Sequence, residues 1–152
     1  MRKNILKISL LSFIAFIFVT GCGNKAKYNG DITSFKYHFG SGEGSIYEYD
    51  INVNNGNVMF IAKGYAGARN LNINKQIDGS YLKQLSIIIK DNNIDNWNKF
   101  DKSAEGLLDG YSFTLEVHYS DGKVIKAHGY EEYPDNYKSA HKKLSEFLKS
   151  IK

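Results

Sequence analysis

The stretch SIYEYDINVNNGNVMFIAKGY, residues 45–65, decides the fold because it carries a strand pattern on each side of a turn. Apolar and aromatic side chains alternate with polar ones in both halves, which is the period of a strand with one buried face. Between the halves lies Asn55-Gly56, the pair that favours a two-residue type I′ turn. The stretch therefore predicts a β-hairpin with strands at 45–54 and 57–65.

The turn and the side-chain pattern select the same register. If Asn54 pairs with Asn57, the predicted partners on one face are all apolar or aromatic: Val53 with Val58, Ile51 with Phe60, and Tyr49 with Ala62. A slip of one residue would turn this set to the opposite face. The same register places Glu48 opposite Lys63 on the other face, where opposite charges attract.

Three further stretches predict strands. Residues 33–39 alternate in the same way and run into the glycine cluster at 40–44, which we interpret as a hairpin loop because it lacks the Lys-Ser/Thr ending of a phosphate-binding loop. Residues 111–119 and 123–130 predict a second hairpin. A three-residue turn with Gly122 in a left-handed conformation gives the consistent register, pairing Val117 with Ile125, Leu115 with Ala127, and Glu116 with Lys126.

Two segments have helical spacing. One begins at Asp78 or Ser80 and ends near Asn92, and it carries Leu82, Leu85, Ile88 and Ile89 on one side. The other opens at Pro134 and places Tyr137, Ala140, Leu144, Phe147, Leu148 and Ile151 on one side. Residues 66–77 indicate a short strand or extended segment, and 94–109 a loop whose aromatic side chains dock on the core. The predicted fold is α+β, in the order β-β-β-α-β-β-α: an antiparallel sheet of about five strands with two helices on one face.

The first 21 residues have the pattern of a secretory signal peptide. Three basic residues, Arg2, Lys3 and Lys7, precede the apolar run 8–19. The run has twelve residues, whereas a membrane-spanning helix needs about 20. We therefore expect the segment to be cleaved.

Val19-Thr20-Gly21-Cys22 resembles the lipobox of bacterial lipoproteins, in which an aliphatic and two small residues precede a lipidated cysteine. The resemblance implies cleavage between Gly21 and Cys22 and a diacylglyceryl group on the Cys22 thiol. The diacylglyceryl group carries two acyl chains, such as palmitate, and two chains make a stable anchor, whereas one acyl chain alone binds membranes only marginally. Residues 22–31 then form a lipidated N-terminus and flexible spacer, and 32–152 a single globular domain.

The composition excludes some classes of partner. Cleavage leaves 17 of the 20 basic residues against 16 acidic ones, so the mature chain has no excess of charge that would attract nucleic acid. Cys22 is the only cysteine, so the fold rests on its core rather than on disulfides.

A further resemblance covers residues 97–134. Trp97-Asn-Lys-Phe100, Asp109-Gly110 before an aromatic strand, Asp121-Gly122, and Tyr133-Pro134 resemble a group of uncharacterised bacterial proteins with Asp-Gly turns and a Tyr-Pro ending. The resemblance implies a shared fold and carries no activity.

Metal and catalytic sites find little support in the sequence. In the predicted register His118 and His128 stand roughly 13 Å apart, too far to share a zinc ion, and we expect His38 and His141 at the surface without local partners. No Gly-x-Ser-x-Gly elbow is present. We therefore predict no cofactor, no metal and no catalytic residue, although five carboxylates could still converge in the fold: Asp109, Asp121, Glu131, Glu132 and Asp135.

The sequence favours a membrane-anchored, extracytoplasmic lipoprotein that acts as a non-enzymatic binding or accessory module of the cell envelope. Its partners would be the membrane, through the lipid on Cys22, and an envelope protein or peptide. Tyr130 and Tyr133 are the candidate binding surface, because they flank the loop before the last helix. The alternative is a small envelope hydrolase whose carboxylates meet only in the fold.

Overall fold

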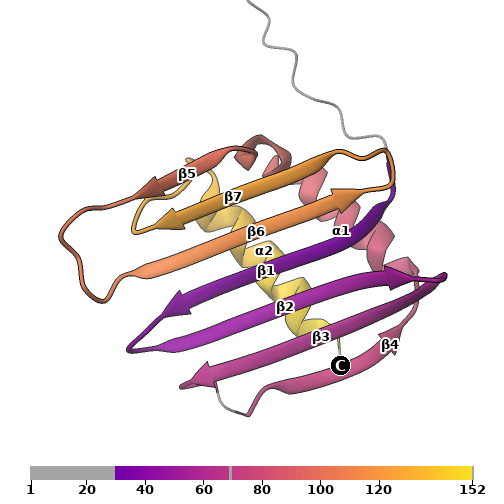
Figure 1. Ribbon diagram of the computed structural model, residues 1–152, viewed down its shortest axis with the longest axis horizontal. Coiled ribbons are helices and arrows are strands. Elements are labelled where there is room, and N and C mark those ends of the chain that lie inside the picture. The colour runs from indigo at the N-terminus through magenta and orange to yellow at the C-terminus, as the bar shows by residue number, and fades with distance from the viewer. Residues whose placement is uncertain (1–29, 69, 152) are drawn as a thin grey trace, which may run out of the picture.

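The computed structural model describes residues 30–68 and 70–151. The predicted signal peptide, its cleavage site, Cys22 and the spacer up to residue 29 lie outside the described residues. Within them, the chain forms one sheet and two α-helices, with both helices on the same face of the sheet (Figure 1). The α+β class is confirmed.

Seven strands make up the sheet, in the order β4-β3-β2-β1-β6-β7-β5. In chain order they are β1 (Ile32–Ser41), β2 (Ser45–Asn54), β3 (Asn57–Ala66), β4 (Asn72–Ile77), β5 (Phe100–Ser103), β6 (Tyr111–Tyr119) and β7 (Val124–Tyr130). The helices are α1 (Ser80–Asp91), the short 3-10 helix η1 (Ile94–Trp97) and α2 (Tyr137–Ser150).

The expectation of about five antiparallel strands is wrong in two places, both at sheet edges. β4 is the segment that the sequence left open between strand and extended chain, and it pairs with β3 through Val58 and Ile77 at one end. β5 pairs in parallel with β7, which makes the sheet mixed. β5 has four residues and a single apolar one, so its sequence has no alternation; only backbone pairing with β7 reveals it.

Both predicted hairpins have the predicted register. Val53 pairs with Val58, Ile51 with Phe60, Tyr49 with Ala62 and Glu48 with Lys63. Asn55 and Gly56 have φ of 49° and 79°, as a type I′ turn requires. In the second hairpin Val117 pairs with Ile125, Leu115 with Ala127 and Glu116 with Lys126, and Gly122 has φ of 81°.

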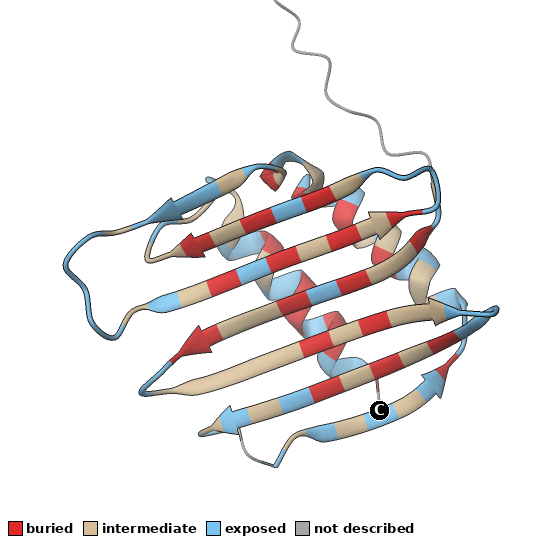
Figure 2. Cartoon of the chain, in the orientation of Figure 1, coloured by how far each residue is buried: buried red, intermediate tan, exposed pale blue. Residues whose placement is uncertain are grey.

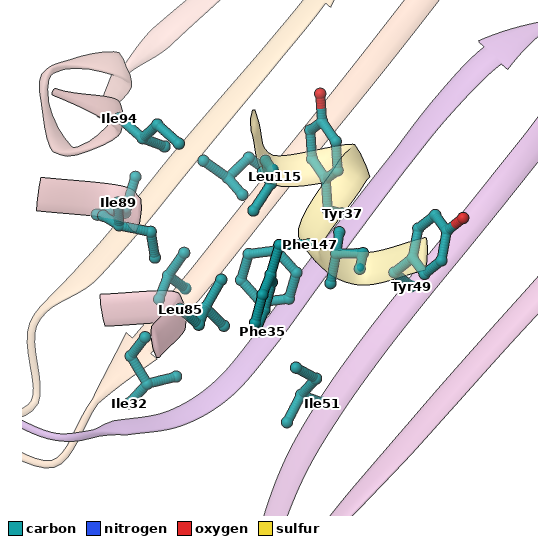
Figure 3. Close-up of a cluster of buried hydrophobic side chains, with 14 of the residues drawn as sticks. Ile32, Phe35, Tyr37, Tyr49, Ile51, Leu85, Ile89, Ile94, Leu115 and Phe147 are labelled. Carbon is teal, nitrogen blue, oxygen red and sulfur yellow. The ribbon is translucent and has the colours of Figure 1, made fainter. Parts of the chain in front are cut away.

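The core lies between the sheet and the two helices. Buried strand residues are interspersed with intermediate or exposed ones (Figure 2), and the buried face meets apolar side chains of α1 and α2, including Leu85, Ile89, Leu144 and Leu148. Figure 3 shows Phe35 at the centre of this layer, near Phe147 of α2 and Leu85 of α1. Trp97 of η1, predicted to fill the core, is 1% exposed.

Helix α2 begins three residues later than the sequence predicted. Pro134 lies in a turn in which the Tyr137 backbone N–H donates to the Pro134 carbonyl, and the helix proper starts at Tyr137. α2 crosses the sheet obliquely and leaves the end of β1 and the start of β2 uncovered (Figure 1). Aromatic side chains of the core face therefore continue beyond the part of the sheet that the helix covers.

Candidate functional site

A row of aromatic side chains follows the core face of β1 and β2 towards this uncovered end. Tyr37 of β1 pairs with Tyr49 of β2, and two residues further Phe39 pairs with Tyr47. All four side chains share one face because side chains of a strand alternate. The Phe39 ring stacks on that of Tyr47, with centroids 5.2 Å apart, and Tyr47 lies parallel to Tyr49 at 6.4 Å.

A second aromatic row comes from α2 and the loop before it. Tyr137 and His141 are four residues apart and so stand one above the other on the helix; their rings stack at 5.3 Å. Tyr133, in the loop before the helix, extends the row by stacking on Tyr137 at 4.6 Å. The two rows meet where the rings of Phe39 and His141 make an edge-to-face contact, with centroids 4.6 Å apart.

Between the rows is a cavity of about 340 Å³, which we name the tyrosine cleft. It is lined by Phe39, Ser45, Tyr47, Tyr111, Tyr133, Tyr137 and His141. Tyr111, at the start of β6, is 55% exposed and stands at the rim. None of the lining residues is fully buried, so each presents part of its surface to solvent.

Three polar groups form a connected network on the inner side of the cleft. The Tyr37 hydroxyl lies 2.6 Å from His141 Nδ1 and 3.3 Å from the Tyr137 hydroxyl. When Tyr37 donates its single proton to Tyr137, Nδ1 of His141 must carry the proton that Tyr37 accepts. Nε2 of His141 is then an unprotonated acceptor on a residue that lines the cleft.

Burial keeps the network uncharged at neutral pH. It raises the pKa of Tyr137 to about 12 and raises the pKa of Tyr37 well above its ordinary value. Burial, together with the nearby Lys149 ammonium, lowers the pKa of His141 from its ordinary value of 6.5. The imidazole is therefore neutral at pH 7.

Tyr49 stands behind the cleft and has an unusual hydroxyl. The residue is 1% exposed, and its hydroxyl is the one buried side-chain polar atom of residues 30–68 and 70–151 without a hydrogen-bond partner. Leaving such a group unpaired costs about 1–3 kcal/mol. The hydroxyls of Tyr37 and Tyr49 both point toward the end of the sheet at which β1 ends (Figure 3).

Of the two tyrosines that the sequence singled out, Tyr133 lines the cleft and Tyr130 does not. The Tyr130 hydroxyl accepts from Gly110 N–H at 2.8 Å and donates to the Leu107 carbonyl at 3.0 Å, so Tyr130 holds the loop between β5 and β6. The Tyr133 hydroxyl donates to the Tyr111 carbonyl at 3.0 Å, which leaves its ring as the surface it offers.

The expectation that His141 is a surface residue without a partner is wrong. Its ring is packed among Tyr37, Phe39 and Tyr137. The spacing of Tyr133, Tyr137 and His141, four residues apart each time, was the available signal for this row. His141 was not assigned to the inner side of the helix because the residues expected on that side were apolar or aromatic.

The other three histidines lie on the outer face of the sheet, each beside a carboxylate. His38 is 3.2 Å from Asp50, a partner that the sequence did not predict; His118 is 2.5 Å from Glu116, and His128 is 3.2 Å from Asp101. Each histidine side chain is more than a third exposed. Within the described part of the chain, no group of three His, Cys, Asp or Glu side chains is placed to hold a metal ion.

The five carboxylates considered for catalysis do not form one cluster. Asp121 lies in the turn after β6, beside Lys123 at 3.3 Å, whereas Asp109 precedes β6, so the nine-residue strand separates them by roughly 30 Å. Glu131 is engaged by the Tyr111 backbone N–H. The described carboxyl groups with a resolved pKa shift are Asp78 and Glu116, and in both the pKa is lowered, opposite to the shift of a catalytic acid.

No protein-family model, curated protein or solved structure matches this chain. Among the described residues, neither helix is long and apolar enough to cross a membrane.

Two histidines are expected to respond to pH in opposite directions. The Asp50 carboxylate raises the pKa of His38, so below the ordinary pKa His38 stabilises the fold, and this contribution is lost as the pH rises through its folded pKa. The pKa of His141 is lowered in the folded chain, so on acidification the imidazole is protonated in the unfolded chain before it is protonated in the folded one. The stability of the fold therefore falls below about pH 6.5. Between about pH 7.5 and pH 5.5, His141→Asn should therefore lose less stability than the wild type, and His38→Asn should lose more.

Denaturant unfolding at both pH values measures this difference. An equal loss of stability in the wild type and in His141→Asn would show that the imidazole is not held neutral.

Proposed function

We propose that this chain is a lipid-anchored protein of the cell envelope that binds a ligand in the tyrosine cleft. The observation that carries the proposal is the cleft itself: a cavity between two aromatic rows, with polar groups that the fold does not use. Aromatic side chains are enriched at binding sites because they offer large rigid surfaces at low entropic cost. The proposed role is binding rather than catalysis.

The polar groups left over for a ligand come from four lining residues. The Tyr47 and Tyr111 hydroxyls, the Ser45 hydroxyl and His141 Nε2 make no hydrogen bond with the described residues. A fold that needed these residues only for packing would be served by phenylalanine and alanine. These four residues instead line a cavity that is open to solvent.

The position of the cleft agrees with an anchor at Cys22. The described chain enters the fold beside the β6–β7 turn, where Asp31 and Ser120 exchange hydrogen bonds. β1 then runs ten residues to the cleft, which is roughly 33 Å at 3.3 Å per residue. A lipid on Cys22 would hold the entry end near the membrane, so the cleft would face away from it.

Lipidation is tested on the protein from cell membranes. Mass spectrometry should find Cys22 as the first residue, carrying a diacylglyceryl group, because Val19-Thr20-Gly21-Cys22 has the lipobox pattern. In a Cys22→Ala variant that mass should disappear. A mature protein that begins elsewhere, or an unmodified Cys22, would contradict the anchor while leaving the cleft untouched.

Binding is tested with purified cell-envelope fragments and the full-length protein in detergent micelles. Tyr47→Ala and Tyr111→Ala should each weaken binding by about fivefold or more, because truncation of an aromatic residue that contacts the ligand can cost over about 1 kcal/mol. Tyr65→Ala is the matched control: Tyr65 is 43% exposed, and its hydroxyl contacts Glu48, outside the cleft.

Thermal melts of all three variants accompany the binding measurement, so that a loss of folding is not taken for a loss of contact. Equal binding by all three folded variants, or an equal loss in Tyr65→Ala, would place the interaction elsewhere.

A further inference from the structure

We infer that the ligand of the tyrosine cleft is an uncharged sugar ring. The inference rests on the proposed function and names the class of ligand that this site would hold. Three properties of the cleft support it: the absence of charge in its lining, its unused hydrogen-bonding groups, and the faces of its aromatic rings.

No lining residue of the cleft carries a formal charge at neutral pH, since burial holds His141 neutral. Two charged residues contact lining residues without lining the cavity themselves: the Lys149 ammonium lies over the Tyr47 ring at 5.2 Å, and Glu131 accepts from the Tyr111 backbone N–H. A charged ligand would lose its hydration without gaining an opposite charge in the lining. An uncharged ligand avoids this cost.

The unused polar groups suit a ligand with several hydroxyls. The hydroxyls of Tyr47, Tyr111 and Ser45 can each donate and accept a hydrogen bond. His141 Nε2 accepts one when Nδ1 donates to the Tyr37 hydroxyl. A sugar hydroxyl likewise both donates and accepts, so one ring can satisfy several of these groups together. A proline-rich peptide lacks most backbone N–H donors and offers mainly carbonyls, which only accept and so cannot satisfy Nε2.

The aromatic rings suit the apolar face of a sugar. C–H bonds on one side of a pyranose ring carry a small positive charge, and they pack on the negative face of an aromatic ring. Tyr111 supplies such a ring, because it lines the cleft and is 55% exposed. The volume of about 340 Å³ lies at the lower end of the range for small-molecule sites, about 300–1,000 Å³. This volume fits a sugar ring better than an extended chain.

The test is an NMR titration of the full-length protein in detergent micelles. The neutral probes are the methyl glycosides of N-acetylglucosamine, glucose and galactose; the charged probes are glucosamine and glucuronic acid. At least one neutral probe should shift the amide signals of residues 44–47 and 133–141 and bind at least tenfold more tightly than either charged probe.

Two conservative variants refine the test. Tyr47→Phe keeps the ring and removes the hydroxyl, so it should weaken the neutral sugar by about fivefold, the loss of one hydrogen bond of about 1 kcal/mol. Tyr65→Phe, outside the cleft, should bind as the wild type does. Both changes keep the ring, and a thermal melt confirms that each variant is folded.

The inference is overturned if no neutral sugar shifts the amide signals of the cleft residues, or if charged sugars bind as tightly as neutral ones. It is also overturned if Tyr47→Phe binds the neutral sugar as tightly as the wild type does. An acetylated proline-rich peptide that shifts the same amides while the sugars do not would also overturn it, and would leave the cleft as a binding site. If in addition envelope binding does not depend on Tyr47 and Tyr111, the proposed function fails as well.

Discussion

Asn55 and Gly56 both have positive φ, 49° and 79°, and the turn they close joins β2 to β3 in a single register. The rest of the structure depends on this constraint. A strand has a side-chain period of two, so the register decides which face of the sheet is apolar along its whole length. With Ile51 opposite Phe60, the same face of β2 also carries Tyr49 and Tyr47. The turn at one end of the hairpin thus determines which side chains lie on the apolar face at the other end.

The path of helix α2 across the sheet turns that aromatic row into a site. The strands β1 and β2 have ten residues each, and α2 crosses them obliquely (Figure 1). Where the helix covers the sheet, the aromatic side chains are core, as Tyr37 and Tyr49 are. Beyond that limit, Phe39 and Tyr47 keep one side open to solvent. His141 joins the two parts, since its ring packs on Phe39 while its Nδ1 meets the Tyr37 hydroxyl.

Local patterns were enough to predict both hairpins, with their registers, and both α-helices. Each depends on neighbours in sequence: a turn with positive φ, or an apolar side with helical spacing. Of the two edge strands, β5 was missed because it depends on a distant partner, whereas β4 was left open between a strand and an extended segment. β5 has only Phe100 as an apolar residue and exists as a strand because β7 offers it a free edge. β4 carries Lys75 opposite Phe60 on the buried face, which breaks its apolar alternation.

The cleft was predicted only in part for the same reason. Tyr133 could be recognised from its place before the last helix, but its partners come from β1, β2 and β6, and nothing local indicates that these strands converge on α2. His141 shows the difficulty most clearly, because a histidine on the apolar side of a helix has no sequence signal for a buried tyrosine partner. Its environment exists only in the assembled fold.

The central claim is that the sheet row and the helix row face one another across the cleft. Nuclear Overhauser effects between aromatic ring protons measure this directly in solution. Cross-peaks are expected between Phe39 and His141, whose ring centroids are 4.6 Å apart, and between Tyr133 and Tyr137, also 4.6 Å apart. Cross-peaks within the helix row, but none from Phe39 to His141, would contradict the account, because the two rows would then not form one site.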